Sequence, residues 1–262
     1  MRPTGAARGI LTTALVGLAA ATAGCGKADY HASDTGATST TAAAVAGSGP
    51  AHGHPHASGP VSVAREAAFE RAVNLVAVDI PGATVSPRPR HPESEDAETR
   101  RCGGAVSTAG ATQEQSPNFT RGTALTREAI SSRVTVLASA QLARESVAVV
   151  ARPSWLACYE GVLRRHFTGG GSSGVRVNSI KVTRVPVSLP GITKVFGIRI
   201  LAEVSSLRSR RLTVKLYLDA FGFALGRAEI NMDATSYVQP EATRTEQDLL
   251  RLMNQRAGLH PL

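Results

Sequence analysis

The sequence predicts an α+β domain in which an antiparallel sheet is covered by helices. Three observations predict this fold class. Apolar residues make up 42% of the 262 residues, which is enough to build a core. The C-terminal half alternates apolar and polar residues with period two, as half-buried strands do. Helical patterns lie at both ends and as a pair in the middle, so the strands lack the crossover helices that a parallel sheet requires.

Residues 1–25 are expected to be a lipoprotein signal peptide. Arg2 and Arg8 give it a positive start, and the charge-free stretch Ile10–Ala23 is too short to cross a hydrocarbon core of about 30 Å. The small residues before Cys25 resemble the lipobox of bacterial lipoproteins. The resemblance implies that Cys25 is acylated and holds the chain on the outer face of the cell membrane. An ordinary cleaved signal and a retained anchor are the alternatives.

Residues 26–63 are expected to form a disordered tether. They are mostly Ala, Thr, Ser, Gly, His and Pro, which bury too little apolar surface to offset the entropy of ordering. A flexible coil of this length spans roughly 35 Å. His52, His54 and His56 alternate in it and could chelate a transition metal, but three local ligands without fixed partners favour a polar linker. No metal and no cofactor is expected.

The cysteines support an exported protein. If Cys25 carries lipid, Cys102 and Cys158 remain, and two leftover cysteines outside the cytosol most simply form a disulfide. That bond would close a loop of about 57 residues and stabilise the fold by roughly 4 kcal/mol in the chain-entropy model. A reactive thiol is the alternative, although neither cysteine has a C-x-x-C partner.

Residues 64–262 are expected to fold as a single domain that opens with a helix over Ala64–Val78. In this interpretation one apolar stripe faces the core and the charged side chains face solvent. The stripe comprises Ala68, Ala72, Leu75 and Val76 with Phe69 and Val73 beside it, and the charged residues are Arg65, Glu66, Glu70 and Arg71. The segment 84–101 is rich in Pro, Arg and acidic residues, so we expect a solvated excursion with at most one short edge strand. A cation site is the less favoured interpretation of its charged run, which comprises His91, Glu93, Glu95, Asp96 and Glu98.

The middle of the domain is predicted to hold one strand and two helices. The strand covers Ser131–Ala138, and Ser139 is expected to cap a helix that reaches Ala151. A second helix runs from Pro153 to about Phe167. Its buried face should comprise Trp155, Cys158, Tyr159, Val162 and Leu163, so that Cys158 points inward.

A glycine-rich breaker then matches G-x-S-x-G at Gly170, Ser172 and Gly174. The serine of that motif acts from a strand-to-helix turn, whereas here a helix precedes and a strand follows. The downstream histidine is His260, three residues from the end of the chain. We therefore favour a simple glycine loop over a hydrolase nucleophile.

Four strands and a closing helix complete the prediction. The strands are Val175–Val187 with a bulge near Asn178, Phe196–Val204, Leu212–Leu218 and Ala224–Ala234, each with one buried and one wet face. Short links, including Ala220–Gly222, favour a meander. The helix covers Pro240–Ala257 and buries its leucines. Small residues in the last strand predict that a helix lies close to it.

These features together resemble a group of actinobacterial lipoproteins of unassigned role. The shared features are the lipobox, the tether, a helix ending in IPGAT, the stretch SPNF, and a helix carrying the second cysteine in SWLACYEGVL. The layout is more distantly similar to the extracellular sensor-type domain of mycobacterial serine/threonine kinases and to PsbP-like lipoproteins. The resemblance implies an α+β domain with disulfides and a cleft, suspected of ligand or partner binding, and it supplies no catalytic residues.

Charge and motifs favour a non-catalytic, membrane-tethered binding domain. The chain carries 29 basic and 20 acidic residues, and removal of Arg2, Arg8, Lys27, Asp29 and Asp34 leaves 26 and 18, a net charge of +8. Such a domain is attracted to an anionic envelope component or an exported protein, and export argues against nucleic acid. The alternative is an envelope hydrolase whose site assembles only in three dimensions, with Asp219, Glu229 and Asp233 as candidate carboxylates on the outward strand face.

Overall fold

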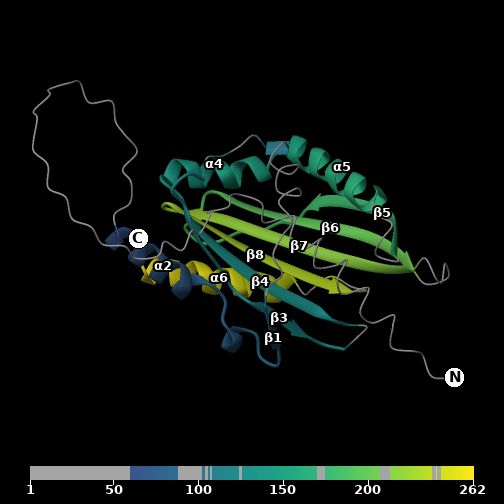
Figure 1. Cartoon of the computed structure of the whole chain (residues 1–262), viewed down its shortest axis with the longest axis horizontal. Coiled ribbons are helices and arrows are strands. Elements are labelled where there is room, and N and C mark those ends of the chain that lie inside the picture. Colours follow the sequence, from purple (N-terminus) through teal and green to yellow (C-terminus); the bar gives the residue numbers. More distant parts are fainter. Residues whose placement is uncertain are drawn as a thin grey trace, which may run out of the picture.

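The computed structural model describes residues 60–87, 102–103, 106, 108–123, 126–169, 175–206, 213–237, 240 and 243–262. Eight strands form one antiparallel sheet between two layers of helices, so the α+β prediction is confirmed (Figure 1). The strand order is β1-β3-β4-β8-β7-β6-β5, and β2 pairs with β4. The helices are α2 (Pro60–Val73), α4 (Ala140–Val150), α5 (Pro153–Gly169) and α6 (Thr243–Leu259). The strands are β1 (Thr84–Ser86), β2 (Thr112–Gln115), β3 (Asn118–Arg121), β4 (Glu128–Val136), β5 (Val175–Arg184), β6 (Val195–Ser206), β7 (Thr213–Leu225) and β8 (Ala228–Tyr237).

The four C-terminal strands form the predicted meander. The predicted bulge is present, because the register of β5 against β6 shifts between Val177 and Ser179. The predicted link at 220–222 is wrong, since β7 continues to Leu225 and turns at Gly226 and Arg227. Gly226 has a φ of +56°, a left-handed conformation that glycine adopts without strain. The tight turn therefore falls at the glycine that permits it, four residues later than expected.

The N-terminal strands extend this meander at β8. β4 pairs with β8 along its whole length, from Glu128 opposite Ser236 to Val136 opposite Ala228. β2 and β3, which the sequence pattern does not predict as strands, both pair with β4, and the short strand β1 forms the sheet edge. The other edge is β5.

Two apolar cores lie on opposite faces of the sheet. One joins α2 and α6 to β4, β8 and the end of β7, and includes Phe69, Phe221 and Met253. The other joins α4 and α5 to β5, β6 and β7, and includes Trp155, Tyr159 and Ile200. As a result β8 is buried along nearly all its length on both faces. The expectation that each strand keeps a wet face is wrong for β8, because a helix layer covers each side of it.

The helices follow their predicted positions, but two predicted faces differ. Ser139 caps α4 by accepting a hydrogen bond from the Leu142 backbone N–H, as predicted. On α5, Trp155, Tyr159, Val162 and Leu163 are buried as predicted, whereas Cys158 is exposed.

Helix α2 departs further from its prediction. It begins at Pro60 rather than Ala64 and ends at Val73 rather than Val78, so residues 60–63, which the sequence pattern predicts as tether, are helical. Glu66 and Glu70 occupy its buried face with Phe69 and Val73. Ala68 and Val76 are exposed instead.

Candidate functional site

Among the described residues, no helix packs on one half of the sheet on the α2/α6 side. The α2/α6 core includes residues of β4, β8 and the end of β7, and most of β5 and β6 and the beginning of β7 lie outside it. We call the side chains there the open face. They form three rows across the strands: Ser179, Glu203 and Lys215; Lys181, Leu201 and Tyr217; and Thr183, Arg199 and Asp219.

The open face is polar with an apolar centre. Lys181 and Lys215 are exposed, while Leu201 and Tyr217 between them are half-buried. The Ser179 hydroxyl donates to Glu203 Oε2 over 3.1 Å. This is the wet face that the alternation of β6 and β7 predicts. Ser179, Lys181 and Lys215 are the exposed residues of the three rows, and the charged ones among them are both cations, so the open face can accept a flat or extended ligand with negative charge.

Arg199 and Asp219 form an ion pair at the edge of the open face that is nearest to α6. Arg199 Nε and Nη2 donate to Asp219 Oδ1 and Oδ2 over 2.6 and 2.5 Å, a two-pronged contact. Asp219 is buried and Arg199 is about three-quarters buried. The hydrogen bonds with Asp219 and the nearby charge of Glu246 raise the pKa of Arg199. The guanidinium is thus fixed as a cation at the border between the sheet and α6.

The three carboxylates of the hydrolase alternative do not converge. Asp219 points to the α2/α6 side, whereas its β8 neighbours Glu229 and Asp233 have the opposite parity to the core residues Ile230 and Met232. All three carboxylates are buried, so their predicted position on a wet face is wrong. Glu229 and Asp233 are four residues apart on one strand, or about 13 Å between Cα atoms, which is wider than the usual span of paired catalytic carboxyl groups.

Glu229 and Asp233 belong to a buried polar row on β4 and β8. Arg133 lies opposite Asn231 and is therefore diagonal to both carboxylates, a placement in which opposite charges attract. Asn231 Nδ2 donates to Glu229 Oε1 over 2.8 Å. The small residue Gly222 on β7 makes room for this row, because a Cβ there would lie 2.3 Å from Asn231 Oδ1. The row therefore places one arginine diagonal to two buried carboxylates.

A second buried group joins α2 to the end of the sheet. Glu66 Oε1 accepts from Arg227 Nη2 over 2.8 Å, and Glu70 Oε1 accepts from the Thr112 hydroxyl over 2.6 Å. Burial raises the pKa of Glu70 to about 7, with a smaller contribution from the neighbouring charges of Glu114 and Glu66. The sequence analysis missed this pair because an i,i+4 pair of glutamates flanked by arginines has the pattern of a solvated helix face.

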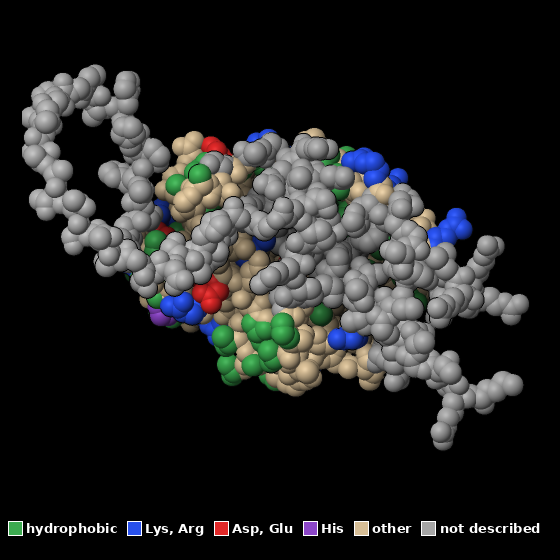
Figure 2. All heavy atoms as spheres, viewed as in Figure 1, with side chains coloured by type: hydrophobic (Ala, Val, Ile, Leu, Met, Phe, Trp, Pro, Cys, Tyr) green, Lys and Arg blue, Asp and Glu red, His purple; other side chains and the backbone are tan. Residues whose placement is uncertain are grey.

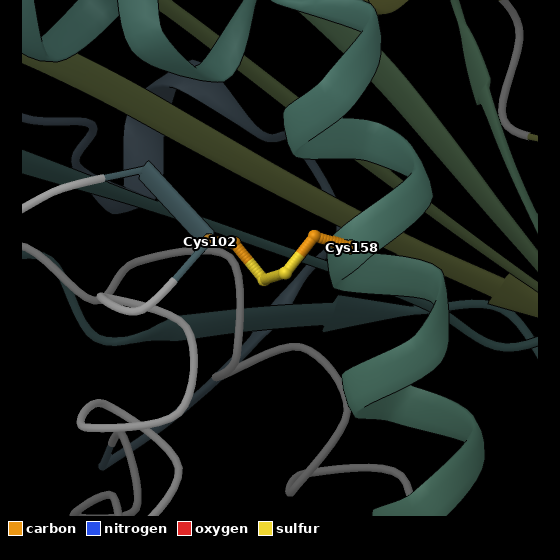
Figure 3. The surroundings of a disulfide bond; sticks show 2 residues. All are labelled: Cys102 and Cys158. Carbon is orange, nitrogen blue, oxygen red and sulfur yellow. A yellow bond between two sulfur atoms is a disulfide. The ribbon is translucent and has the colours of Figure 1, made fainter.

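The predicted disulfide is present between Cys102 and Cys158, with Cα atoms 5.5 Å apart (Figure 3). It joins the segment at Cys102 to the side of α5. The adjacent Gly103 fits closely against both helices, since a Cβ there would lie 2.4 Å from Val149 and 3.2 Å from Trp155. The disulfide and this contact hold residues 102 and 103 on the α4/α5 layer.

The remaining predicted site residues, apart from His260, fall outside the described part of the chain. Cys25, His52, His54 and His56 lie outside it, as do Gly170, Ser172 and Gly174 and the charged run from His91 to Glu98. His260 lies exposed just after α6. Among the described residues, no three His, Cys, Asp or Glu side chains gather as metal ligands. None of the described helices is long and apolar enough to span a membrane.

Comparison with known proteins gives two distant similarities of fold. The extracellular domain of PknH from Mycobacterium tuberculosis has a TM-score of 0.41 at 11% identity, over 77% of this chain and 99% of that one. An uncharacterised protein from Mycobacterium smegmatis, the ortholog of Rv0999, has a TM-score of 0.30 at 13% identity, over 78% and 99%. No protein-family model matches the sequence, and no curated protein matches it. The distant similarity that the sequence layout predicts is therefore found.

Proposed function

We propose that the chain is an exported lipoprotein, anchored through Cys25, whose non-catalytic domain binds an anionic component of the cell envelope on the open face. The observation that carries this proposal is the open face itself. It presents Lys181 in the row of Leu201 and Tyr217, and Lys215 beside Tyr217 on β7, on a part of the sheet outside the core that the described helices α2 and α6 form.

Two features support export and anchoring. The Cys102–Cys158 disulfide is of the kind that persists in oxidising compartments. The sequence before the domain has the order of a lipoprotein leader, with a positive start, a short apolar stretch and small residues before Cys25.

The geometry of the open face supports an extended anionic ligand. Lys215 and Tyr217 are two residues apart on β7, and Lys181 lies two strands away in the row of Tyr217. Strand spacings place the Cα atoms of Lys181 and Lys215 roughly 12 Å apart. A polymer with repeated phosphate groups can contact both ammonium groups while its backbone lies across Leu201 and Tyr217. The net charge of +8 on residues 64–262 adds a long-range attraction.

The test measures binding of the full acylated chain in detergent to poly(glycerol phosphate), with charge-reversal variants. Lys181→Glu with Lys215→Glu should weaken binding by on the order of 25-fold, taking about fivefold for each lysine near an anionic surface. The matched control is Lys194→Glu, because Lys194 is an exposed lysine just before β6, outside the open face. Equal weakening by the control, or unchanged binding by the double variant, would show that the open face is not the binding surface.

A further inference from the structure

We infer that the outer surface of the α2/α6 layer lies on an anionic lipid bilayer, an orientation that rests on the proposed anchor at Cys25. We call this the basal surface. It comprises the exposed apolar residues Val63, Val76, Val78, Val85 and Leu259, and the exposed arginines Arg65, Arg71, Arg244 and Arg251.

The exposed large apolar side chains of the described residues lie on α2, on α6, on the short segment that follows α2, and on the edge strand β1. Val63 lies on α2, and Leu259 is the last residue of α6. Val78 lies in the short 3₁₀ helix Ala77–Asp79 that follows α2, and Val76 immediately precedes it. Val78 is 78% exposed, Val85 50% and Val76 42%. Figure 2 shows a patch of hydrophobic side chains where Figure 1 places β1 and this short helix. The described residues of the α4/α5 layer have no comparable group.

Val85 faces the same way as the helices. It pairs with Phe119 across β1 and β3, and directly opposed side chains of an antiparallel pair share a face. Phe119 belongs to the α2/α6 core. The Val85 side chain therefore lies on the α2/α6 side of the sheet.

On α2 and α6 most acidic side chains are buried and most basic side chains are exposed. The acidic side chains Glu66, Glu70 and Glu246 are each at most 2% exposed. The exposed charged side chains on the described parts of these helices are four arginines and Asp248, a net charge of +3. Arg251 pairs with Asp248, and Arg71 lies 3.6 Å from Glu114, which reduces but does not reverse the excess. A basic surface with exposed apolar groups is what an anionic membrane interface attracts.

The position of the anchor fits this orientation. Only 34 residues, 26–59, separate Cys25 from the start of α2 at Pro60. A coil of that composition and length spans roughly 30 Å, so the layer that begins with α2 is within reach of the bilayer. The Arg65 guanidinium donates to the Pro261 carbonyl, which joins the beginning of α2 to the end of α6 and places Val63 and Leu259 in the same region.

The experiment measures how deeply two fluorophore-labelled positions of the acylated full chain lie in a lipid bilayer. In the Val78→Cys variant, acylated Cys25 and the Cys102–Cys158 disulfide leave one reactive thiol for an environment-sensitive fluorophore. The matched control is Arg144→Cys, on the exposed side of α4 in the opposite layer. Both proteins are placed on vesicles of phosphatidylcholine alone or mixed with phosphatidylglycerol, and nitroxide-labelled lipids quench the fluorophore.

On the anionic vesicles, quenching at residue 78 should exceed quenching at residue 144 by at least about threefold, since interfacial groups enter about 5–10 Å into the bilayer. The excess should shrink on neutral vesicles and in high salt. Equal quenching at both positions would overturn the inference. So would shielding of residue 78 in neutral detergent together with a dimer mass, which would assign the surface to a second copy of the chain. A chain that lacks lipid on Cys25 by intact mass would instead disprove the proposed anchor.

Discussion

The pair of buried glutamates on α2 predicts that the fold loses stability as the pH rises through neutrality. Glu70 is 2% exposed and accepts a hydrogen bond from the Thr112 hydroxyl, while the cation Arg227 is bonded to Glu66. Burial raises the pKa of Glu70 from 4.5 to about 7, so the folded chain keeps the proton that the unfolded chain releases.

The sign and size of the effect follow from proton linkage. Between pH 4.5 and pH 7 the folded state binds more protons at Glu70 than the unfolded state does, so the free energy of unfolding falls as pH rises. Below pH 4.5 both states hold the proton, and above pH 7 both have lost it. At 1.36 kcal/mol per pKa unit, the shift lowers the free energy of unfolding by about 3 kcal/mol across this window.

The assay is urea unfolding of the native chain and a Glu70→Gln variant at intervals from pH 4 to pH 8. The amide keeps an oxygen that can accept from Thr112 and does not ionise, so the variant should lack this fall. The difference in free energy of unfolding between the two proteins should change by about 3 kcal/mol across the window. Glu145→Gln, on the exposed side of α4, is the matched control and should follow the native chain. If Glu70→Gln also follows the native pH dependence, the assignment of the effect to Glu70 is wrong.

Three further predictions concern stability. Replacing both Cys102 and Cys158 with Ser should lower the free energy of unfolding by about 4 kcal/mol in the chain-entropy model, and urea unfolding of the native chain with and without reductant should show a similar difference. Gly222→Ala should cost about 1–3 kcal/mol and lower Tm, because its Cβ would lie 2.3 Å from Asn231 Oδ1 and 2.4 Å from the Phe196 ring; an unchanged Tm would contradict this packing. Asp219→Asn should destabilise by roughly 3 kcal/mol because it removes the carboxylate that Arg199 binds, while Arg199→Met with Asp219→Asn should recover part of that loss in the same assay.

The parts of the fold that the sequence predicts are those governed by local periodicity. The alternation of β6 and β7 predicts paired strands with one wet face, and the open face is that wet face. Ser139 before an apolar stripe predicts the cap that forms on α4. The odd count of cysteines, with Cys25 assigned elsewhere, predicts the pair that the structure contains. Each of these depends on a few neighbouring residues or on a simple count, so tertiary context has little to alter.

The predictions that are wrong concern side chains whose burial depends on the surrounding elements and not on the local sequence pattern. The strand β8 shows the same alternation as β6, yet the alternate side chains Glu229, Asn231 and Asp233 are buried, because β4 pairs with β8 and helices cover both sides. Periodicity reports which side chains share a face, and it cannot report whether a second layer covers that face.

The same reasoning explains α2. Ala68 and Ala72 give a small-residue stripe, but alanine buries little area, whereas Phe69 and Val73 supply more apolar surface and bring Glu66 and Glu70 inward with them. The cost of burying Glu66 is reduced by Arg227 from the turn between β7 and β8, more than 150 residues later in the chain. A carboxylate that a distant residue neutralises cannot be recognised from a local pattern.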